Sequence, residues 1–252
     1  MSTAVVTAAV GEIGRAVVER LLGEKIVTRV IAVDVAEPAG PLPDGAELVR
    51  CDLRGSAGLA ELLDATPGEI SVLVNVLGGE RQPPVRPISD VAWPPPEVWD
   101  DIVDLNLSGV YRLTRALVDR LVAPAAVCNV SSIAATMPWT VSPAYGAAKA
   151  ALEHWTTSLA VLLADKGIRV NLVRPGFVWS RQWQLVDRDE FNRVVCDRVP
   201  LRQIGATDQT DREQTAGDVA DAVAYLCSPA AAHVTGQAIN VDGGAALIRA
   251  AR

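Results

Sequence analysis

The chain has few of the basic residues that polyanions attract. Its 252 residues include 23 Lys plus Arg against 30 Asp plus Glu, which gives a net charge of −7. Only Lys25, Lys149 and Lys166 are lysines. Nucleic acids and anionic membrane surfaces bind clustered Lys and Arg, which this sequence does not supply. We therefore expect neither a nucleic acid nor a membrane as a partner.

Cysteine and histidine are also scarce. The four cysteines are far apart and form no CxxC pair, and the two histidines are His154 and His233. This spacing favours buried free thiols over a disulfide framework or a zinc site. The N-terminus shows no signal-peptide pattern, and no apolar run is long enough to span a bilayer. We expect a cytoplasmic protein without a metal.

Hydrophobic residues make up 50% of the chain and alternate between two patterns. Seven short apolar runs predict buried strands: Ala4–Thr7, Val27–Asp34, Glu47–Asp52, Val72–Val76, Ala126–Ser131, Ile168–Val173 and Ala238–Val241. Five longer segments have helical spacing: Ile13–Leu22, Gly58–Ala65, Val98–Leu121, Ala144–Asp165 and Asp218–Leu226. This alternation predicts one α/β domain over residues 1–252, a Rossmann-type, doubly wound parallel sheet with helices on both faces. Ligands bind such sheets at the carboxyl ends of the strands.

Three segments interrupt the alternation. Glu37–Gly45 is rich in Pro and Gly and leaves little room for a helix, and Gln82–Pro96 is a proline-rich extended loop. Residues 180–217 are polar and irregular, which is typical of a lid over a substrate site.

The turn after the first strand predicts a nucleotide site. Thr7 to Gly14 lead from a strand into a helix, whose first backbone N–H groups can bind a pyrophosphate. Asp34 ends the second strand 20 residues after Gly14, where a carboxylate can accept hydrogen bonds from ribose hydroxyls. The same charge would repel a 2′-phosphate. We therefore expect NAD(H) rather than NADP(H).

Tyr145 and Lys149 are four residues apart in a helical segment and share one face. In a chain of this length with three tyrosines and three lysines, the number of Tyr–Lys pairs expected at this spacing by chance is about 0.04. Ser132 follows the fifth strand, thirteen residues before Tyr145, and Asn106 lies in the preceding helix. An ammonium beside a phenol lowers the phenol pKa, so this group of residues favours acid/base chemistry at Tyr145.

These residues resemble the motifs of the short-chain dehydrogenase/reductase family, and the resemblance covers nearly the whole chain. Tyr145-Gly146-Ala147-Ala148-Lys149 is similar to the family's Tyr-x-x-x-Lys pair. Five other segments carry further resemblance: Cys51–Leu53, Asn75–Gly78, Leu105–Gly109, Asn171–Gly176 and Gly236–Gly244.

The resemblance implies an NAD(H)-dependent oxidoreductase that interconverts a secondary alcohol and a ketone. The implied catalytic residues are Asn106, Ser132, Tyr145 and Lys149, with Tyr145 as the general acid/base. The implied cofactor contacts are Thr7, Gly11, Ile13, Gly14, Asp34, Asp52, Leu53, Asn75, Gly78, Tyr145, Lys149, Pro175, Gly176 and Val178. Relatives commonly form tetramers through the helices that contain Asn106 and Tyr145, which implies a homotetramer or a dimer here.

Three tryptophans fall in segments that border the substrate cleft in this family. Trp139 lies between Ser132 and Tyr145, and Trp179 and Trp183 follow the Pro-Gly segment. Together with Ser132 and Tyr145 they suggest a cyclic or aromatic substrate, although tryptophans at such positions also pack lids and subunit interfaces.

Two positions depart from the family's glycine-rich loop: Ala8 replaces its first glycine and Glu12 its second. A positive φ at Ala8 would strain the turn, and a carboxylate at position 12 would repel a pyrophosphate. A third departure is the segment 206–214, which looks like an insertion where relatives are shorter. The departures in the glycine-rich loop leave two alternatives open. One is a non-catalytic nucleotide sensor or scaffold on the same fold, and the other is an isomerase or dehydratase that uses the same acid/base pair.

Overall fold

The seven predicted strands form one parallel sheet in the order β3-β2-β1-β4-β5-β6-β7. The structure, a computed structural model, describes residues 2–79, 94–137, 142–180, 183, 187–203 and 213–247. The strands are β1 (Thr3–Thr7), β2 (Arg29–Asp34), β3 (Ala46–Arg50), β4 (Ile70–Asn75), β5 (Leu121–Val130), β6 (Ile168–Pro175) and β7 (Ala238–Val241). The order reverses between β1 and β4, and such a reversal places a crevice at the carboxyl ends of both strands.

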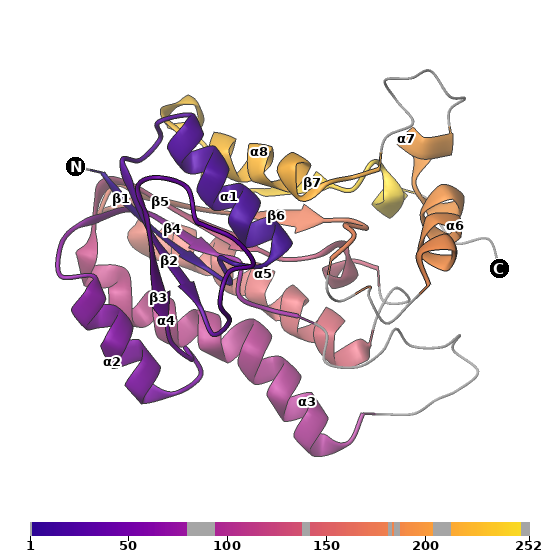
Figure 1. Ribbon diagram of the computed structural model, residues 1–252, viewed down its shortest axis with the longest axis horizontal. Helices are drawn as coiled ribbons and strands as arrows, with labels where there is room; N and C mark the ends of the chain where they lie inside the picture. The colour runs from indigo at the N-terminus through magenta and orange to yellow at the C-terminus, as the bar shows by residue number, and fades with distance from the viewer. Residues whose placement is uncertain are drawn as a thin grey trace.

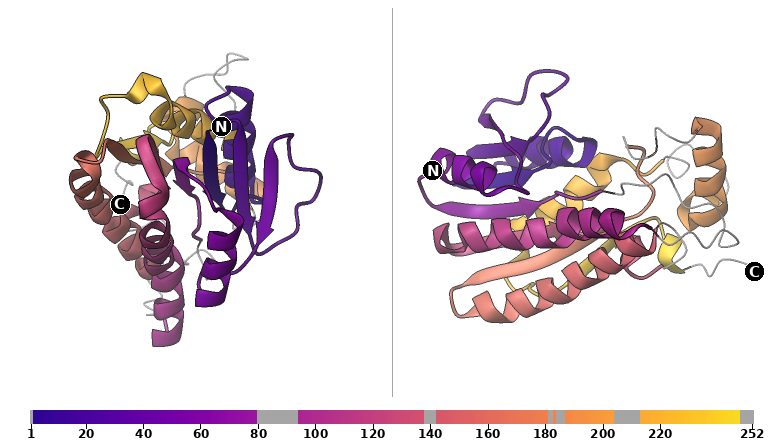
Figure 2. Two further views of the ribbon diagram at one scale, coloured as in Figure 1. Left: turned by 90° about the vertical axis from the view of Figure 1, so that its left-hand side faces the viewer. Right: turned by 90° about the horizontal axis from the view of Figure 1, so that it is seen from below.

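Helices cover both faces of the sheet (Figures 1 and 2). Their bounds are α1 (Glu12–Gly23), α2 (Ser56–Ala65), α3 (Pro96–Val103), α4 (Gly109–Leu117), α5 (Pro143–Ala164), α6 (Arg188–Arg198), α7 (Pro200–Gln203) and α8 (Ala216–Cys227). One hydrophobic core packs α1 and α8 against one face, and a second packs α2, α4 and α5 against the other. The predicted doubly wound fold is therefore confirmed. Among the described helices, none has the length and apolar character that crossing a bilayer requires.

The long helix predicted over Val98–Leu121 is wrong in two places. A π-helical turn (η1, Asp104–Ser108) separates α3 from α4, and Leu121 already belongs to β5. The side-chain amide of Asn106 donates a 2.9 Å hydrogen bond to the carbonyl oxygen of Ile102. In a regular α-helix that oxygen would accept from the backbone N–H of Asn106, so the side chain displaces the helical ladder.

The segment predicted to be irregular, 180–217, contains the helix α6. Asp187 caps it by accepting hydrogen bonds from the backbone N–H groups of Asp189 and Glu190. Phe191, Val195 and Val199 are buried at four-residue spacing. That spacing is the signal that sequence analysis could have used. In Figure 1, α6 lies beyond the carboxyl end of β6. Most of the insertion at 206–214 lies outside the described residues.

Candidate active site

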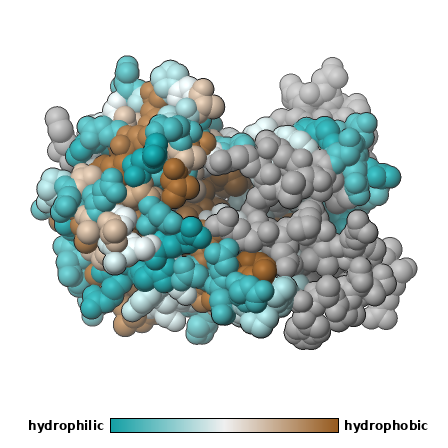
Figure 3. Space-filling view, turned by 60° about the horizontal axis from the view of Figure 1, so that its bottom comes forward, coloured by the Kyte–Doolittle hydropathy of each residue, from teal (hydrophilic) through white to brown (hydrophobic). Residues whose placement is uncertain are grey.

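The main cavity lies where the sheet order reverses and has a volume of about 560 Å³. Its walls come from the ends of β1, β2, β4, β5 and β6 and from α5. On the part of the face that Figure 3 draws in colour, polar side chains predominate, and apolar ones gather near the central hollow. A cavity of this size with a few convergent polar groups is typical of a small-molecule site.

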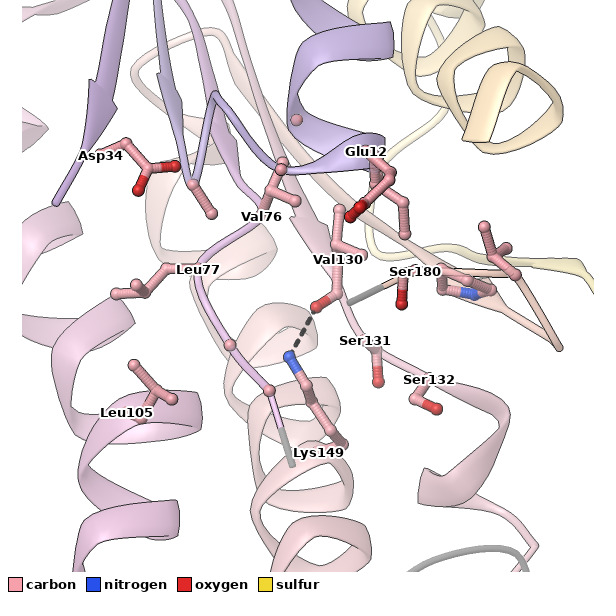
Figure 4. Close-up of a pocket in the computed structure, with 18 of the residues that line it drawn as sticks. Glu12, Asp34, Val76, Leu77, Leu105, Val130, Ser131, Ser132, Lys149 and Ser180 are labelled. Atoms are coloured by element: carbon pink, nitrogen blue, oxygen red, sulfur yellow. Dashed lines mark hydrogen bonds between the residues drawn. The ribbon is translucent and has the colours of Figure 1, made fainter. Parts of the chain in front are cut away.

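Two of the predicted catalytic side chains come together on α5. Tyr145 and Lys149 are 9% and 2% exposed, and the ammonium nitrogen of Lys149 lies 5.7 Å from the centre of the Tyr145 ring. The ammonium also donates a 2.9 Å hydrogen bond to the carbonyl oxygen of Val130, which Figure 4 shows as a dashed line. Burial lowers the pKa of Lys149 to about 8, and the negative charge of Glu153 opposes that shift.

Ser132 lines the same cavity just after β5. Its backbone is extended, and its hydroxyl oxygen accepts a 3.1 Å hydrogen bond from the backbone N–H of Ala134. This contact orients the hydroxyl group, whose hydrogen can still be donated to a substrate oxygen. The structure thus brings Ser132, Tyr145 and Lys149 to one cavity, as the sequence predicts.

Asn106 is fully buried behind the cavity and is not among the residues that line it. Its Oδ1 accepts from the backbone N–H of Gly79, and its Nδ2 donates to the carbonyl oxygen of the same residue, both at 2.9 Å. Gly78 has a φ of +152°, and a Cβ there would lie 2.6 Å from the Lys149 nitrogen and 2.7 Å from the Asn106 Oδ1. The backbone at Gly78 therefore separates Asn106 from Lys149, and only glycine leaves room for both.

Asp34 marks the other end of the cavity. In Figure 4 it lies across the cavity from Ser132. Its carboxylate accepts 3.0 Å hydrogen bonds from the backbone N–H groups of Val10 and Ala36, so it also holds the turn after β1. The next residue, Val35, is 62% exposed and carries no charge. This end of the cavity is suited to hydroxyl groups that donate hydrogen bonds to a carboxylate.

Arg54 also lines this end of the cavity, and sequence analysis missed it. Its guanidinium donates to both carboxylate oxygens of Asp52 at 2.8–3.2 Å and to Asp101 at 3.3 Å. Hydrogen bonding to Asp52 raises the pKa of Arg54. Among the described residues, Arg54 is the one cationic side chain that lines the cavity near Asp34. Two carboxylates already bind it.

The turn between β1 and α1 is unusually tight. A Cβ on Gly14 would lie 2.1 Å from the carbonyl oxygen of Ala8, so the helix can approach the turn only with glycine there. Ala8 has a φ of +49°, the conformation that strains a residue with a side chain. The exposed Glu12 begins α1, and its carboxylate reaches toward the cavity in Figure 4.

Most of the predicted cofactor contacts line this cavity, but Thr7 and Asn75 do not. The Thr7 hydroxyl accepts a hydrogen bond from the backbone N–H of Leu77, and Asn75 donates to the side chains of Asn129 and Thr114. Both are buried, so their role in this structure is to join neighbouring strands. The residues that do line the cavity as predicted are Gly11, Ile13, Gly14, Asp34, Asp52, Leu53, Gly78, Tyr145, Lys149, Pro175, Gly176 and Val178.

The three tryptophans differ in position. Trp183 lines the cavity, whereas Trp179 packs edge-on against Phe191 with ring centres 4.9 Å apart and does not line it. Arg188 lies over the Trp179 ring at 4.5 Å, which anchors α6 to this aromatic cluster. Trp139 lies outside the described residues. Ser180, which sequence analysis also missed, lines the cavity two residues after Val178.

Comparison with known proteins identifies the family of the chain. The model described as enoyl-(acyl carrier protein) reductase matches residues 7–246, nearly the whole chain. The chain belongs to the short-chain dehydrogenase/reductase family. It is therefore an oxidoreductase of the kind that acts on CH–OH and C=O groups, and the predicted membership is confirmed.

Individual members of the family are similar over their full length. The 3-oxoacyl-[acyl-carrier-protein] reductase of Escherichia coli K12 is 30% identical over 253 residues, and nodulation protein G of Rhizobium sp. strain N33 is 31% identical over 255. Each alignment covers 97% of both chains. Among solved structures, the 3-ketoacyl-(acyl-carrier-protein) reductase of Brucella melitensis, complexed with NADH, has a TM-score of 0.80 at 28% identity and covers 97% of this chain and 98% of that one. Ligand-free aldohexose dehydrogenase of Thermoplasma acidophilum has a TM-score of 0.82 at 25% identity, with 100% and 96% covered.

Proposed function

We propose that the protein is an NAD(H)-dependent oxidoreductase that interconverts a secondary alcohol and a ketone. The observation that carries this proposal is the convergence of Tyr145, Lys149 and Ser132 on one cavity whose far end carries Asp34. Gly14 lets the first turn of α1 pack against the turn after β1, and this helix N-terminus lines the cavity, where its backbone N–H groups can bind a pyrophosphate. When bound, the nicotinamide supplies or accepts the hydride.

The side chains of the chain itself handle the proton. In ketone reduction, Ser132 donates a hydrogen bond that orients the carbonyl oxygen, and Tyr145 gives that oxygen its phenolic proton. The buried ammonium of Lys149 stabilises the phenolate that remains. Asn106 holds the backbone at Gly79 and so positions the neighbouring Gly78, whose backbone lies against the ammonium. In alcohol oxidation Tyr145 accepts the proton instead.

The preference for NAD(H) follows from charge at the Asp34 end. A 2′-phosphate there would lie against a carboxylate, beside the uncharged Val35, and Arg54 is already held by Asp52 and Asp101. The relative from Brucella melitensis was solved with NADH, which supports the same assignment.

Titration with NADH and with NADPH, followed by nicotinamide fluorescence, tests the cofactor proposal. We expect NADH to bind at least roughly tenfold more tightly, and Asp34→Ala to abolish most of this difference. Asp44→Ala removes the same charge from an exposed turn in the β2–β3 connection and is the matched control. Equal binding of both cofactors to the unchanged protein would contradict the proposal.

The substrate end of the cavity is largely apolar. Ile133, Phe177 and Trp183 line it beside Ser132 and Tyr145, which suits a cyclic or aromatic ketone. We infer that α6, within the segment 180–217, forms part of a lid here, because it buries Phe191 against Trp183 with ring centres 5.1 Å apart. A panel of cyclohexanone, 1-tetralone and acetoacetyl-coenzyme A distinguishes cyclic and aryl ketones from 3-oxoacyl thioesters, the type of substrate named for two of the relatives.

We also infer a homotetramer, or a dimer, formed through the outer surface of α4 and α5. On this surface Tyr111 is 48% exposed and packs edge-on against Trp155, next to the exposed and small Ala151. Apolar groups of this kind are expected to bury against a second copy. Ala151→Arg should shift the sedimentation coefficient to that of a monomer, and an unchanged oligomer would contradict this interface. Cys51, Cys128 and Cys227 are buried as expected, but Cys196 is exposed, so the expected burial of all four thiols is wrong at that position. We infer a reducing, cytoplasmic setting, in which thiols persist.

A further inference from the structure

Glu153 continues the stripe of functional side chains on α5. Tyr145, Lys149 and Glu153 are spaced by four residues and therefore lie on one helix face. The Glu153 side chain is only 13% exposed. A carboxylate held this far from water needs charged or hydrogen-bonding partners.

Glu153 finds these partners at the ends of two strands that frame the cavity. Its Oε1 accepts a 2.8 Å hydrogen bond from the Ser131 hydroxyl and a 2.7 Å bond from the Nε of Arg174. Its Oε2 accepts a 2.6 Å bond from the Nη2 of Arg174, which completes a two-pronged ion pair. Arg174, 22% exposed, also donates to the Oδ1 of Asn240 on β7 at 3.1 Å.

The positions of these partners connect Glu153 to the reacting groups. Ser131 immediately precedes Ser132 at the end of β5, and Arg174 immediately precedes Pro175 and Gly176 in the cavity wall. One carboxylate therefore joins α5 to the ends of β5 and β6, and through Arg174 to β7. A two-pronged Arg–carboxylate pair restricts orientation as well as distance.

We propose that Glu153, through its ion pair with Arg174, is a positioning residue that fixes Ser132 and the Pro175-Gly176 wall relative to Tyr145 and Lys149. Glu153 does not itself line the cavity. This inference rests on the proposed function. It adds two residues, Glu153 and Arg174, to the groups that determine the turnover rate.

The test compares Glu153→Gln, Arg174→Gln and the double variant with the unchanged protein. We measure NADH affinity and the fluorescence of bound NADH, and steady-state turnover of whichever ketone in the panel is reduced fastest. Each single variant should lower kcat at least roughly tenfold and reduce the fluorescence enhancement, with the NADH Kd changed less than about threefold. The double variant leaves no unpaired buried charge, so it should fold, and its kcat should be no lower than that of either single variant.

Glu47→Gln, which breaks the exposed pair of Glu47 with Arg29, controls for the general loss of an ion pair. A lower Tm with unchanged kcat and unchanged bound-NADH fluorescence would show a merely structural role and overturn the proposal. If the fold losses in kcat of the two single variants multiply in the double variant, the two residues act independently of each other. That result would also overturn the proposal. Tyr145→Phe, measured alongside, keeps the two questions separate: full activity in that variant contradicts the proposed function, whereas full activity in Glu153→Gln contradicts only the positioning role.

Discussion

The ammonium nitrogen of Lys149 lies 5.7 Å from the centre of the Tyr145 ring and is almost completely buried. Its hydrogen bond to the Val130 carbonyl, at 2.9 Å, leaves two N–H groups for other partners. The arrangement brings a positive charge to a phenol that must become a phenolate during ketone reduction. It also places that charge where water solvates it poorly, which carries a cost in stability.

Lys149→Met is expected to stabilise the fold while abolishing turnover. Burial lowers the pKa of Lys149 to about 8, below the value of about 10.4 in an unfolded chain. Between these values the unfolded chain binds more protons than the folded protein, so the contribution of this group to stability rises from about pH 8 to about pH 10.4. Near neutral pH the shift corresponds to a cost on the order of 3 kcal/mol, part of which the methionine should recover.

Urea unfolding at neutral pH and near pH 10 measures this effect. The stability difference between Lys149→Met and the unchanged protein should shrink at the higher pH, because the lysine is then neutral in the folded state. Lys166→Met, at an exposed position, controls for the removal of a lysine. A less stable Lys149→Met protein would show that the ammonium is better compensated than its burial indicates.

Ala8→Gly should stabilise the protein by about 0.5–1 kcal/mol, because Ala8 holds a φ of +49° that glycine adopts without strain. The adjacent Ala9 is buried and has no positive φ, so Ala9→Gly serves as the control and should destabilise. Urea denaturation measures both free energies of unfolding. A loss of stability in Ala8→Gly would mean that the methyl group of Ala8 contributes more through packing than its backbone costs.

Glu12→Gln should tighten NADH binding by roughly fivefold to tenfold. The carboxylate lies at the first turn of α1 and lines the cavity, so it repels the pyrophosphate expected at that helix end. Glu19→Gln makes the same charge change farther along α1, away from the cavity, and should leave the Kd unchanged. The gain in Glu12→Gln should diminish as salt concentration rises. Weaker binding would show that Glu12 supports the cofactor rather than opposing it.

Sequence patterns predicted the sheet and the convergence of Ser132, Tyr145 and Lys149, because buried parallel strands are continuous apolar runs and helical spacing fixes a shared face. They could not predict the π-helical turn at Asn106, since its cause is a side-chain hydrogen bond to Ile102 that no periodicity reveals. They also missed the Glu153–Arg174 pair, whose members are 21 residues apart on different elements. Only the packing of α5 against β6 brings these two residues together.

The most direct test of the account measures ketone-dependent oxidation of NADH, followed by its absorbance, in the unchanged protein and in Tyr145→Phe. We expect the unchanged protein to turn over at least one ketone in the panel. In Tyr145→Phe, kcat should fall by at least roughly a hundredfold while NADH affinity changes little, because the phenolic proton is lost but the cavity keeps its shape. Turnover in Tyr145→Phe equal to that of the unchanged protein would contradict the central claim that Tyr145 transfers the proton.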